Sequence, residues 1–504
     1  MNINKVYYKL LIITLFLTSC GSTKTSIPHH IHSDTTSIVA KKVALTESEF
    51  QQWPYTDIFT DSIPGISLLK TQTLLKEKKI TPIIVGVIDS GVDIEHKSLI
   101  DFIWRNDDEI TNNKKDDDDN GYIDDVHGWN FLGSNHGNML SAQLELTRMI
   151  KTYESKTLDE IMETDQKEYD IYQQQKEVFN QTSTWVNETY NDLIQKLDTS
   201  PEDEKLKEAL AHFESQKKFH YNLDYEPRDI IGDNPNDVSD SNYGNPDVIG
   251  FKDKESHGTH VAGIIATVIN ISVESGDNDI KIMPIRAIPD GDEYDKDVAL
   301  AIRYAVDNGA KVINMSFGKA YSAHPNWVYE AIEYAKKHDV LLIMGAGNNS
   351  ENIDSAANFP NDTKNSDVEF IDNVISVGAT THYYNTDKLV SKFSNYGKRN
   401  VDIFAPGSKI YSTFPDNQYS YQDGTSMAAP MVSGVATLIR SYYPKLSAGQ
   451  VKQVIMNSGI SVAFEVNVGM WGDKKLLSDL SVSGKILNAY NALLMAENLS
   501  NEKK

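Results

Sequence analysis

The sequence predicts an α/β protein built on a mostly parallel β-sheet flanked by helices. Two short apolar runs rich in aliphatic and β-branched side chains, residues 83–88 and 340–344, predict strands buried on both faces. Helical patterns of small and apolar residues follow positions 257 and 426. Polar residues that could carry chemistry stand where these strands end and these helices begin, so the junctions are the candidate sites.

The first buried run leads directly into an aspartate. Asp89 follows residues 83–88, and Ser90 and Gly91 then turn the chain away. The carboxyl end of a strand in an α/β sheet is where ligands bind. Asp89 is therefore a candidate functional carboxylate, although it could also serve only as a cap on the strand end.

An acidic segment follows, in which residues 116–125 read DDDDNGYIDD. Oxygen ligands at alternate positions, followed by a glycine for a sharp turn, suit calcium, and the pattern resembles EF-hand loops. The glutamate that closes such a loop is missing, because His127 stands at the twelfth position. A solvated acidic turn is the alternative. The candidate calcium ligands are Asp116, Asp118, Asn120 and Asp124 or Asp125.

A histidine opens the next junction, where residues 257–263 read HGTHVAG. Imidazole is the side chain best matched to proton transfer near pH 7. His257 precedes the helix and is the candidate base. His260 is the competing candidate, but it lies three residues into the helix, where we expect it to be buried and hydrogen-bonded.

The third junction holds a serine in residues 424–430, which read GTSMAAP. The small-residue run 427–436 predicts a buried helix, so the Ser426 hydroxyl would emerge at its N-terminus, where N–H groups and the helix dipole favour negative charge. A serine becomes a nucleophile when an imidazole takes its proton and fixed donors stabilise the oxyanion. Asp89 and His257 supply an orienting carboxylate and a base.

These three motifs resemble those of the subtilases, the subtilisin-like serine proteases, and they occur in the same chain order. The resemblance covers residues 80–132 and 245–460. It implies a subtilisin-like fold and a serine endopeptidase that acts on polypeptides through an Asp-His-Ser triad and an acyl-enzyme. This chemistry needs no metal or organic cofactor, so calcium would only stabilise the fold.

Two further segments match the same family. Asn348, in the GAGNN sequence of residues 345–349, would donate its side-chain N–H2 to the oxyanion; Asn349 is the competing assignment, and a turn-forming asparagine is the alternative. Residues 311–318 resemble the strand that pairs with the extended substrate backbone. The resemblance implies that Ser316, Phe317 and Gly318 form one side of the primary specificity pocket.

The largest departure from the family is an insertion at residues 134–245, which separates Asp89 from His257 by 168 residues. Long charged segments predict a helical hairpin or small bundle with a partial apolar face. Since it joins catalytic strand ends, we expect it at the rim of the active-site cleft, where it gates access or binds a protein partner; a solvated spacer is the alternative. The helices expected are 140–163, 166–197 and a third that begins with Ser200 as N-cap and Pro201 at N1 and ends near 219.

The N-terminus predicts export and lipid anchoring. Residues 1–19 have the basic start and apolar run of a signal peptide, and Leu17-Thr18-Ser19-Cys20 resembles a bacterial lipobox, which implies lipid attachment at Cys20. Ser22 favours the outer membrane of a Gram-negative host, facing the periplasm or the surface. An ordinary signal peptide is the alternative. Residues 20–50 read as a flexible tether, and 51–133 with 246–504 as the peptidase domain.

Composition restricts the partners. The net charge is −24 and no basic stripe is present, which argues against a nucleic-acid partner. The single cysteine excludes an internal disulfide. The span before the first strand is short for a folded pro-domain, so the need for pro-segment cleavage stays open, as does the oligomeric state. The rival functions are a non-catalytic surface lipoprotein that binds through the insertion, and an esterase or peptide-ligating enzyme with the same triad.

Overall fold

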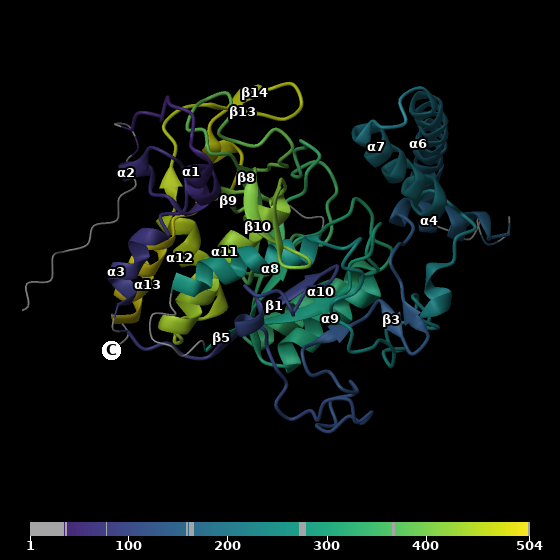
Figure 1. Cartoon of the computed structure of the whole chain (residues 1–504), viewed down its shortest axis with the longest axis horizontal. Helices are drawn as coiled ribbons and strands as arrows, with labels where there is room; N and C mark the ends of the chain where they lie inside the picture. The colour runs from purple at the N-terminus through teal and green to yellow at the C-terminus, as the bar shows by residue number, and fades with distance from the viewer. Residues whose placement is uncertain are drawn as a thin grey trace, which may run out of the picture. The chain divides into compact units, whose positions relative to one another are not determined.

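The computed structural model describes residues 35, 38–76, 78–157, 160, 166–271, 279–364 and 368–501. Nine strands of the described residues form the main sheet in the order β12-β15-β9-β8-β7-β6-β1-β5-β2. Figure 1 labels β1, β5, β8 and β9 of this sheet. All neighbouring pairs are parallel except β12 with β15. Its strands are β1 (Ile83–Asp89), β2 (Trp129–Asn130), β5 (Ile280–Arg286), β6 (Ala310–Met315), β7 (Leu341–Gly345), β8 (Val374–Thr380), β9 (Ile403–Pro406), β12 (Ile460–Ser461) and β15 (Lys485–Ile486).

Helices cover both faces of this sheet, so the expected α/β fold is confirmed. Val85 and Val87 of β1 point into a core shared with helices on one face, whereas Ile88 points into a second core on the other face. This alternation buries each central strand on both sides, as continuous apolar runs require. The first face carries α8 (His257–Ile269), α11 (Thr425–Tyr442), α12 (Ala448–Ser458) and α13 (Ala489–Asn501), and the second carries α9 (Asp295–Asp307) and α10 (Pro325–Lys337).

The segment before β1 is packed into the first core. Helix α1 (Glu47–Gln52) begins inside the range 20–50 that we expected to be a tether, and a capping box with Thr46 fixes its start. Trp53 is fully buried. Short helical turns follow at α2 (Ile58–Asp61) and α3 (Gln72–Leu75).

The insertion is helical, as expected. Its helices are α4 (Glu145–Glu154), α6 (Gln166–Thr199) and α7 (Glu204–Ser215), and a π-helical turn follows at Gln216–His220 (Figure 1). The expected N-cap at Ser200 is wrong. Asp203 caps α7 instead, because its carboxylate accepts hydrogen bonds from the backbone N–H groups of Lys205 and Leu206.

Within the described ranges, three two-stranded sheets lie outside the main sheet. They pair β3 (Gly133–Ser134) with β4 (Gly137–Asn138), β10 (Ile410–Phe414) with β11 (Gln418–Gln422), and β13 (Val466–Val468) with β14 (Asp473–Lys475). Among the helices that the structure describes, none is long and apolar enough to cross a membrane. The predicted signal peptide and Cys20 lie outside the described residues.

Candidate active site

The structure brings Asp89 and His257 together. Asp89 is the last residue of β1 and is 1% exposed, and His257 is the first residue of α8. The His257 Nδ1 atom lies 2.7 Å from Asp89 Oδ1, which also accepts a hydrogen bond from the Ser90 N–H. Gly258 makes this approach possible, because a Cβ atom there would come within 2.2 Å of the Gly91 carbonyl oxygen.

Asp89 also changes the proton affinity of His257. Desolvation by burial disfavours the charged imidazolium. The negative charge of Asp89 and its hydrogen bond to His257 outweigh this effect, so the pKa of His257 is raised. The His257 side chain is 38% exposed, so the imidazole is not enclosed by the protein.

The competing histidine is buried in the fold. His260 is fully buried, and its Nε2 atom lies 3.0 Å from the carbonyl oxygen of Ile410 and 3.1 Å from that of Ser420. Burial lowers the pKa of His260 to about 4. A neutral imidazole that donates to two backbone carbonyls joins α8 to the β10–β11 hairpin, and it does not contact Asp89.

Ser426 lies in the first turn of α11, as the small-residue motif predicts. Its Oγ atom donates a hydrogen bond of 3.0 Å to the Ser316 carbonyl oxygen instead of to His257. The Ser316 hydroxyl in turn donates to the Ser426 carbonyl oxygen at 2.9 Å. The serine is therefore tied directly to the segment that the sequence identifies as substrate-binding.

Asn348 follows β7 with its amide held in one orientation. Its Oδ1 atom accepts hydrogen bonds from the Thr425 N–H at 2.9 Å and the Thr425 hydroxyl at 3.1 Å. The oxygen is thus occupied and the N–H2 group is left to donate. Asn349 is exposed, and its backbone N–H donates to Asn395. Thr425 was missed by the sequence analysis, although it adjoins Ser426.

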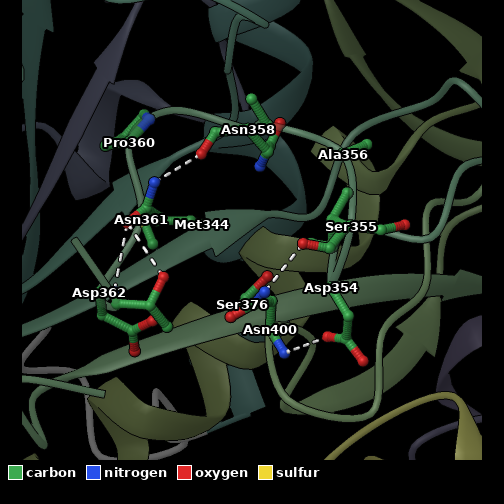
Figure 2. A pocket seen from close by; sticks show the side chains of 13 residues that line it. Met344, Asp354, Ser355, Ala356, Asn358, Pro360, Asn361, Asp362, Ser376 and Asn400 are labelled. Atoms are coloured by element: carbon green, nitrogen blue, oxygen red, sulfur yellow. Dashed lines mark hydrogen bonds between the residues drawn. The ribbon is translucent and has the colours of Figure 1, made fainter. Parts of the chain in front are cut away.

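The predicted substrate-binding residues run from the end of β6 towards a pocket. Gly318 is exposed, and a Cβ atom on Gly318 or on Gly347 would lie 3.6 Å from Asn358 Oδ1. Asn358 also lines a pocket of about 240 Å³, whose wall includes Ser376 and Asn400 (Figure 2). Asn358 therefore lies beside both glycine segments and also lines the polar cavity.

The acidic loop gathers only part of its predicted calcium ligands. Carboxylate oxygens of Glu109, Asp118 and Asp125 lie within 4.8 Å of one another. Asn120 donates its side-chain N–H2 to Asp118 and Asp125. Burial raises the pKa of Asp125 to about 6. Glu109 was missed because it precedes the repeated Asp-x-Asp pattern.

The other two predicted ligands point to the backbone. Asp116 accepts hydrogen bonds from the N–H groups of Asn120 and Gly121, and Asp124 accepts them from those of Asn113 and Lys114. Of the two open assignments, Asp125 therefore lies in the cluster and Asp124 does not. Asp116 stabilises the turn.

A second carboxylate cluster already contains a cation. Asp362, Glu369 and Asp402 are close enough to share a metal ion, but Lys452 Nζ lies 2.9 Å from Glu369 and 3.2 Å from Asp402. The lysine is buried, and the acids raise its pKa against the effect of burial. This internal ammonium group balances the acids as a structural element of the fold.

A mostly parallel sheet that carries an aspartate, a histidine and a helix-borne serine at the carboxyl ends of its strands has the layout of an α/β serine hydrolase. The chain belongs to the subtilase family, because the sequence model described as "Subtilase family" matches residues 81–484. The resemblance inferred from the three motifs is thereby confirmed.

Three relatives are similar to the chain over part of their length. The chain is 37% identical over 230 residues to a cell wall-associated protease of Bacillus subtilis (strain 168). The aligned region covers 45% of this chain and 23% of that protein. It is 40% identical over 192 residues to a thermophilic serine proteinase of Bacillus sp. (strain AK1), and the aligned region covers 38% of this chain and 43% of that protein. It is 32% identical over 213 residues to subtilisin DY of Bacillus licheniformis, covering 42% and 72%. The chain thus spans less than half of the first two relatives.

Proposed function

We propose that this protein is a serine endopeptidase whose catalytic triad is Asp89, His257 and Ser426. The observation that carries the proposal is the 2.7 Å contact between Asp89 and His257 Nδ1, on a protein of the subtilase family. This contact fixes the imidazole so that Nε2 is the nitrogen that receives a proton. The names of the relatives, a protease, a serine proteinase and a subtilisin, support the same activity.

In the proposed reaction the Ser426 hydroxyl first rotates away from the Ser316 carbonyl oxygen. It then gives its proton to His257 Nε2 as Oγ attacks a peptide carbonyl, and Asp89 stabilises the imidazolium. The oxyanion receives hydrogen bonds from the Asn348 N–H2 and the Ser426 N–H, which lies in the first helical turn, where no intrahelical acceptor exists. The imidazolium then gives the proton to the leaving amine as the C–N bond breaks, which leaves the acyl-enzyme and neutral His257. Water, which gives a proton to His257, then attacks the acyl carbonyl and Ser426 Oγ leaves with that proton.

Polypeptide backbone is the proposed ligand of residues 316–318. A peptide whose carbonyl points at Asn348 would extend its side chain between Gly318 and Gly347 towards Asn358. The Asn358 amide would then form the floor of the primary specificity pocket, and the polar cavity in Figure 2 would lie beyond it. Main-chain pairing accepts many sequences, so this floor is where side chains are selected.

Calcium is proposed as a structural ion at the acidic loop. Glu109, Asp118 and Asp125 offer hard oxygen ligands at one point, which fits calcium. The ion would offset their mutual repulsion and take no part in catalysis.

Export and lipid anchoring are proposed from the sequence alone. The lipobox-like residues before Cys20 support lipidation, and Ser22 supports an outer-membrane position facing the periplasm or the surface. Metabolic labelling with an alkyne fatty acid tests this, because replacement of Cys20 by serine should abolish the label.

The helical insertion is proposed to border the substrate cleft. Lys319, next to the substrate-binding residues, is buried and its Nζ atom lies 2.8 Å from Glu145 of α4. Tyr321 donates a 2.5 Å hydrogen bond to Gln175 of α6. These contacts support a role in gating access or in binding a protein partner.

A fluorophosphonate probe tests the central proposal. The full-length protein should be labelled, and Ser426→Ala should lose the label because the probe reacts only with an activated serine. Cleavage of a peptide library separates endopeptidase activity from esterase or ligase activity. A folded wild-type protein that stays unlabelled would favour the non-catalytic binding lipoprotein.

A further inference from the structure

Arg286 is a fully buried charged residue beside the proposed triad. It ends β5 and is the Cα partner of Asp89 in the parallel pairing of β1 with β5. Burying a guanidinium group is costly unless all its donors find partners. Those partners connect it to the segments that carry two of the three proposed triad residues, Asp89 and His257.

The first partner is Glu255, two residues before His257. Arg286 donates from Nη2 to Glu255 Oε1 at 2.6 Å and from Nε to Glu255 Oε2 at 3.1 Å. This two-point contact is the planar arrangement that a guanidinium forms with a carboxylate. Glu255 Oε2 also accepts the Phe251 N–H at 2.9 Å, so the pair fixes the loop that leads into α8.

The second partner is the turn after Asp89. Arg286 Nε donates to the Ser90 carbonyl oxygen at 2.8 Å. The Asp89 carbonyl oxygen accepts the N–H groups of the next two residues after Arg286, at 3.0 and 3.2 Å. The strand ends that carry Asp89 and Arg286 are therefore joined by backbone and side chain.

The remaining donors bond to residues around the start of the insertion, Asn130 and Met139. Arg286 Nη1 donates to Asn130 Oδ1 at 3.1 Å, and Nη2 donates to the Met139 carbonyl oxygen at 2.7 Å. Gly250 leaves the space that the group needs, because a Cβ atom there would lie 2.3 Å from Glu255 Oε2 and 2.5 Å from Arg286 Nε. One rigid cation thus touches three segments that are distant in sequence.

We propose that Arg286 is a positioning residue that fixes the geometry of the Asp89–His257 pair through Ser90 and Glu255. The inference rests on the proposed function, since that pair is its object. Displacements of about 1 Å at a reacting group cost on the order of a hundredfold in rate. A lysine cannot replace Arg286, because one ammonium group does not reproduce the planar fork. None of the hydrogen bonds that Arg286 makes within the described chain reaches residues 316–318, so substrate binding should not depend on it.

The test compares Arg286→Met with Arg228→Met in the full-length protein. Arg228 is the control, because it is also a buried arginine in an ion pair, although its partners are two carboxylates, Asp233 and Asp297, and not one. Both variants should be less stable. After correction for the folded fraction, only Arg286→Met should lose kcat, by about 10- to 100-fold with unchanged KM. Equal kcat in the two variants, or a loss confined to KM, would overturn the proposal.

Arg286→Lys keeps the inference testable if the methionine variant does not fold. It should fold and keep a low kcat, and full recovery of kcat by lysine would show that charge alone suffices and would refute the proposal. The proton spectrum gives a readout that needs no activity, because a short His–Asp hydrogen bond produces a far-downfield resonance. That resonance should persist in Arg228→Met and shift or vanish in Arg286→Lys. An unlabelled wild type would defeat the proposed function, whereas an unchanged resonance in Arg286→Lys would defeat only the role of Arg286.

Discussion

Asn348 illustrates how a single residue is prepared for its proposed role. Both hydrogen bonds from Thr425 end on its Oδ1 atom, so the N–H2 group faces outward without needing to be reordered when charge develops. A donor that is already oriented is worth more than one that must turn during the reaction. The neighbouring Asn349 has no such restraint from Thr425.

Replacement of Asn348 by alanine should lower kcat by about 10² to 10³, a range taken from other serine proteases, with little change in KM. The expected loss falls on kcat because the amide acts on the oxyanion and not on bound substrate. Steady-state kinetics on one peptide measures both constants. Asn349→Ala is the control, and a larger loss in that variant would reassign the oxyanion donor.

The raised pKa of His257 sets the pH dependence of the proposed reaction. The base must be neutral to accept the serine proton, so activity should rise with pH through a midpoint above the ordinary histidine value of 6.5. Asp89→Asn removes the charge that raises the pKa of His257, whereas the desolvation that lowers this pKa remains. The midpoint of kcat/KM should therefore move to lower pH, with a plateau reduced by about 10⁴. A midpoint that stays in place would show that Asp89 does not act on His257.

At the scale of the element, we expect calcium binding at the acidic loop to raise the thermal stability of the protein. About a hundredfold excess of ion over Kd adds about 2.7 kcal/mol to the free energy of unfolding, which raises Tm by several degrees. Thermal unfolding with calcium or with EGTA measures this difference. Asp118→Asn should abolish it. Asp124→Asn should retain it, because that carboxylate binds backbone N–H groups outside the cluster; a Tm that ignores EGTA would refute the site.

Elements defined by local pattern were predictable from the sequence. The strand ending at Asp89 and the helix starting at His257 follow from apolar runs and adjoining glycines, and both occur as expected. Partners that come from distant segments were not predictable. Glu109 joins Asp125 across a turn, and Arg286 meets Glu255 only because β5 lies beside β1. A sequence pattern carries no information about such pairings until the sheet order is known.

At the scale of the whole molecule, the segment before β1 packs against the start of α13. Ala489 of α13 donates its N–H to the Ile66 carbonyl oxygen at 2.7 Å, and Asn488 donates to the Ser67 hydroxyl at 2.7 Å. Trp53 is buried in the same core. Removal of residues 53–68 as a pro-segment would expose this core, so the packing favours an enzyme that keeps them.

The helical part of the insertion, residues 144–220, begins and ends side by side. The Leu144 N–H donates to the His220 carbonyl oxygen at 3.2 Å, and the Thr147 hydroxyl donates to the same oxygen at 2.7 Å. The chain therefore enters and leaves this helical part at adjacent points. Its helices pack around a small core of their own, which includes Ile150, Tyr172 and Phe179.

Replacement of residues 149–218 by a short glycine linker should leave the peptidase sheet folded. Glu145 and Thr147 lie outside the replaced segment, so their contacts with Lys319 and His220 remain. If the insertion restricts access to the cleft, the variant should cleave folded proteins faster relative to a short peptide than the wild type does. A partner-binding role should instead leave this ratio unchanged and abolish capture of that partner. The ratio of kcat/KM for a protein and a peptide substrate is the measurement. Glu145→Gln is a second variant, which keeps the insertion but weakens the ion pairs of Glu145 with Lys319 and Arg148. An unchanged ratio together with unchanged partner capture would reduce the insertion to a spacer.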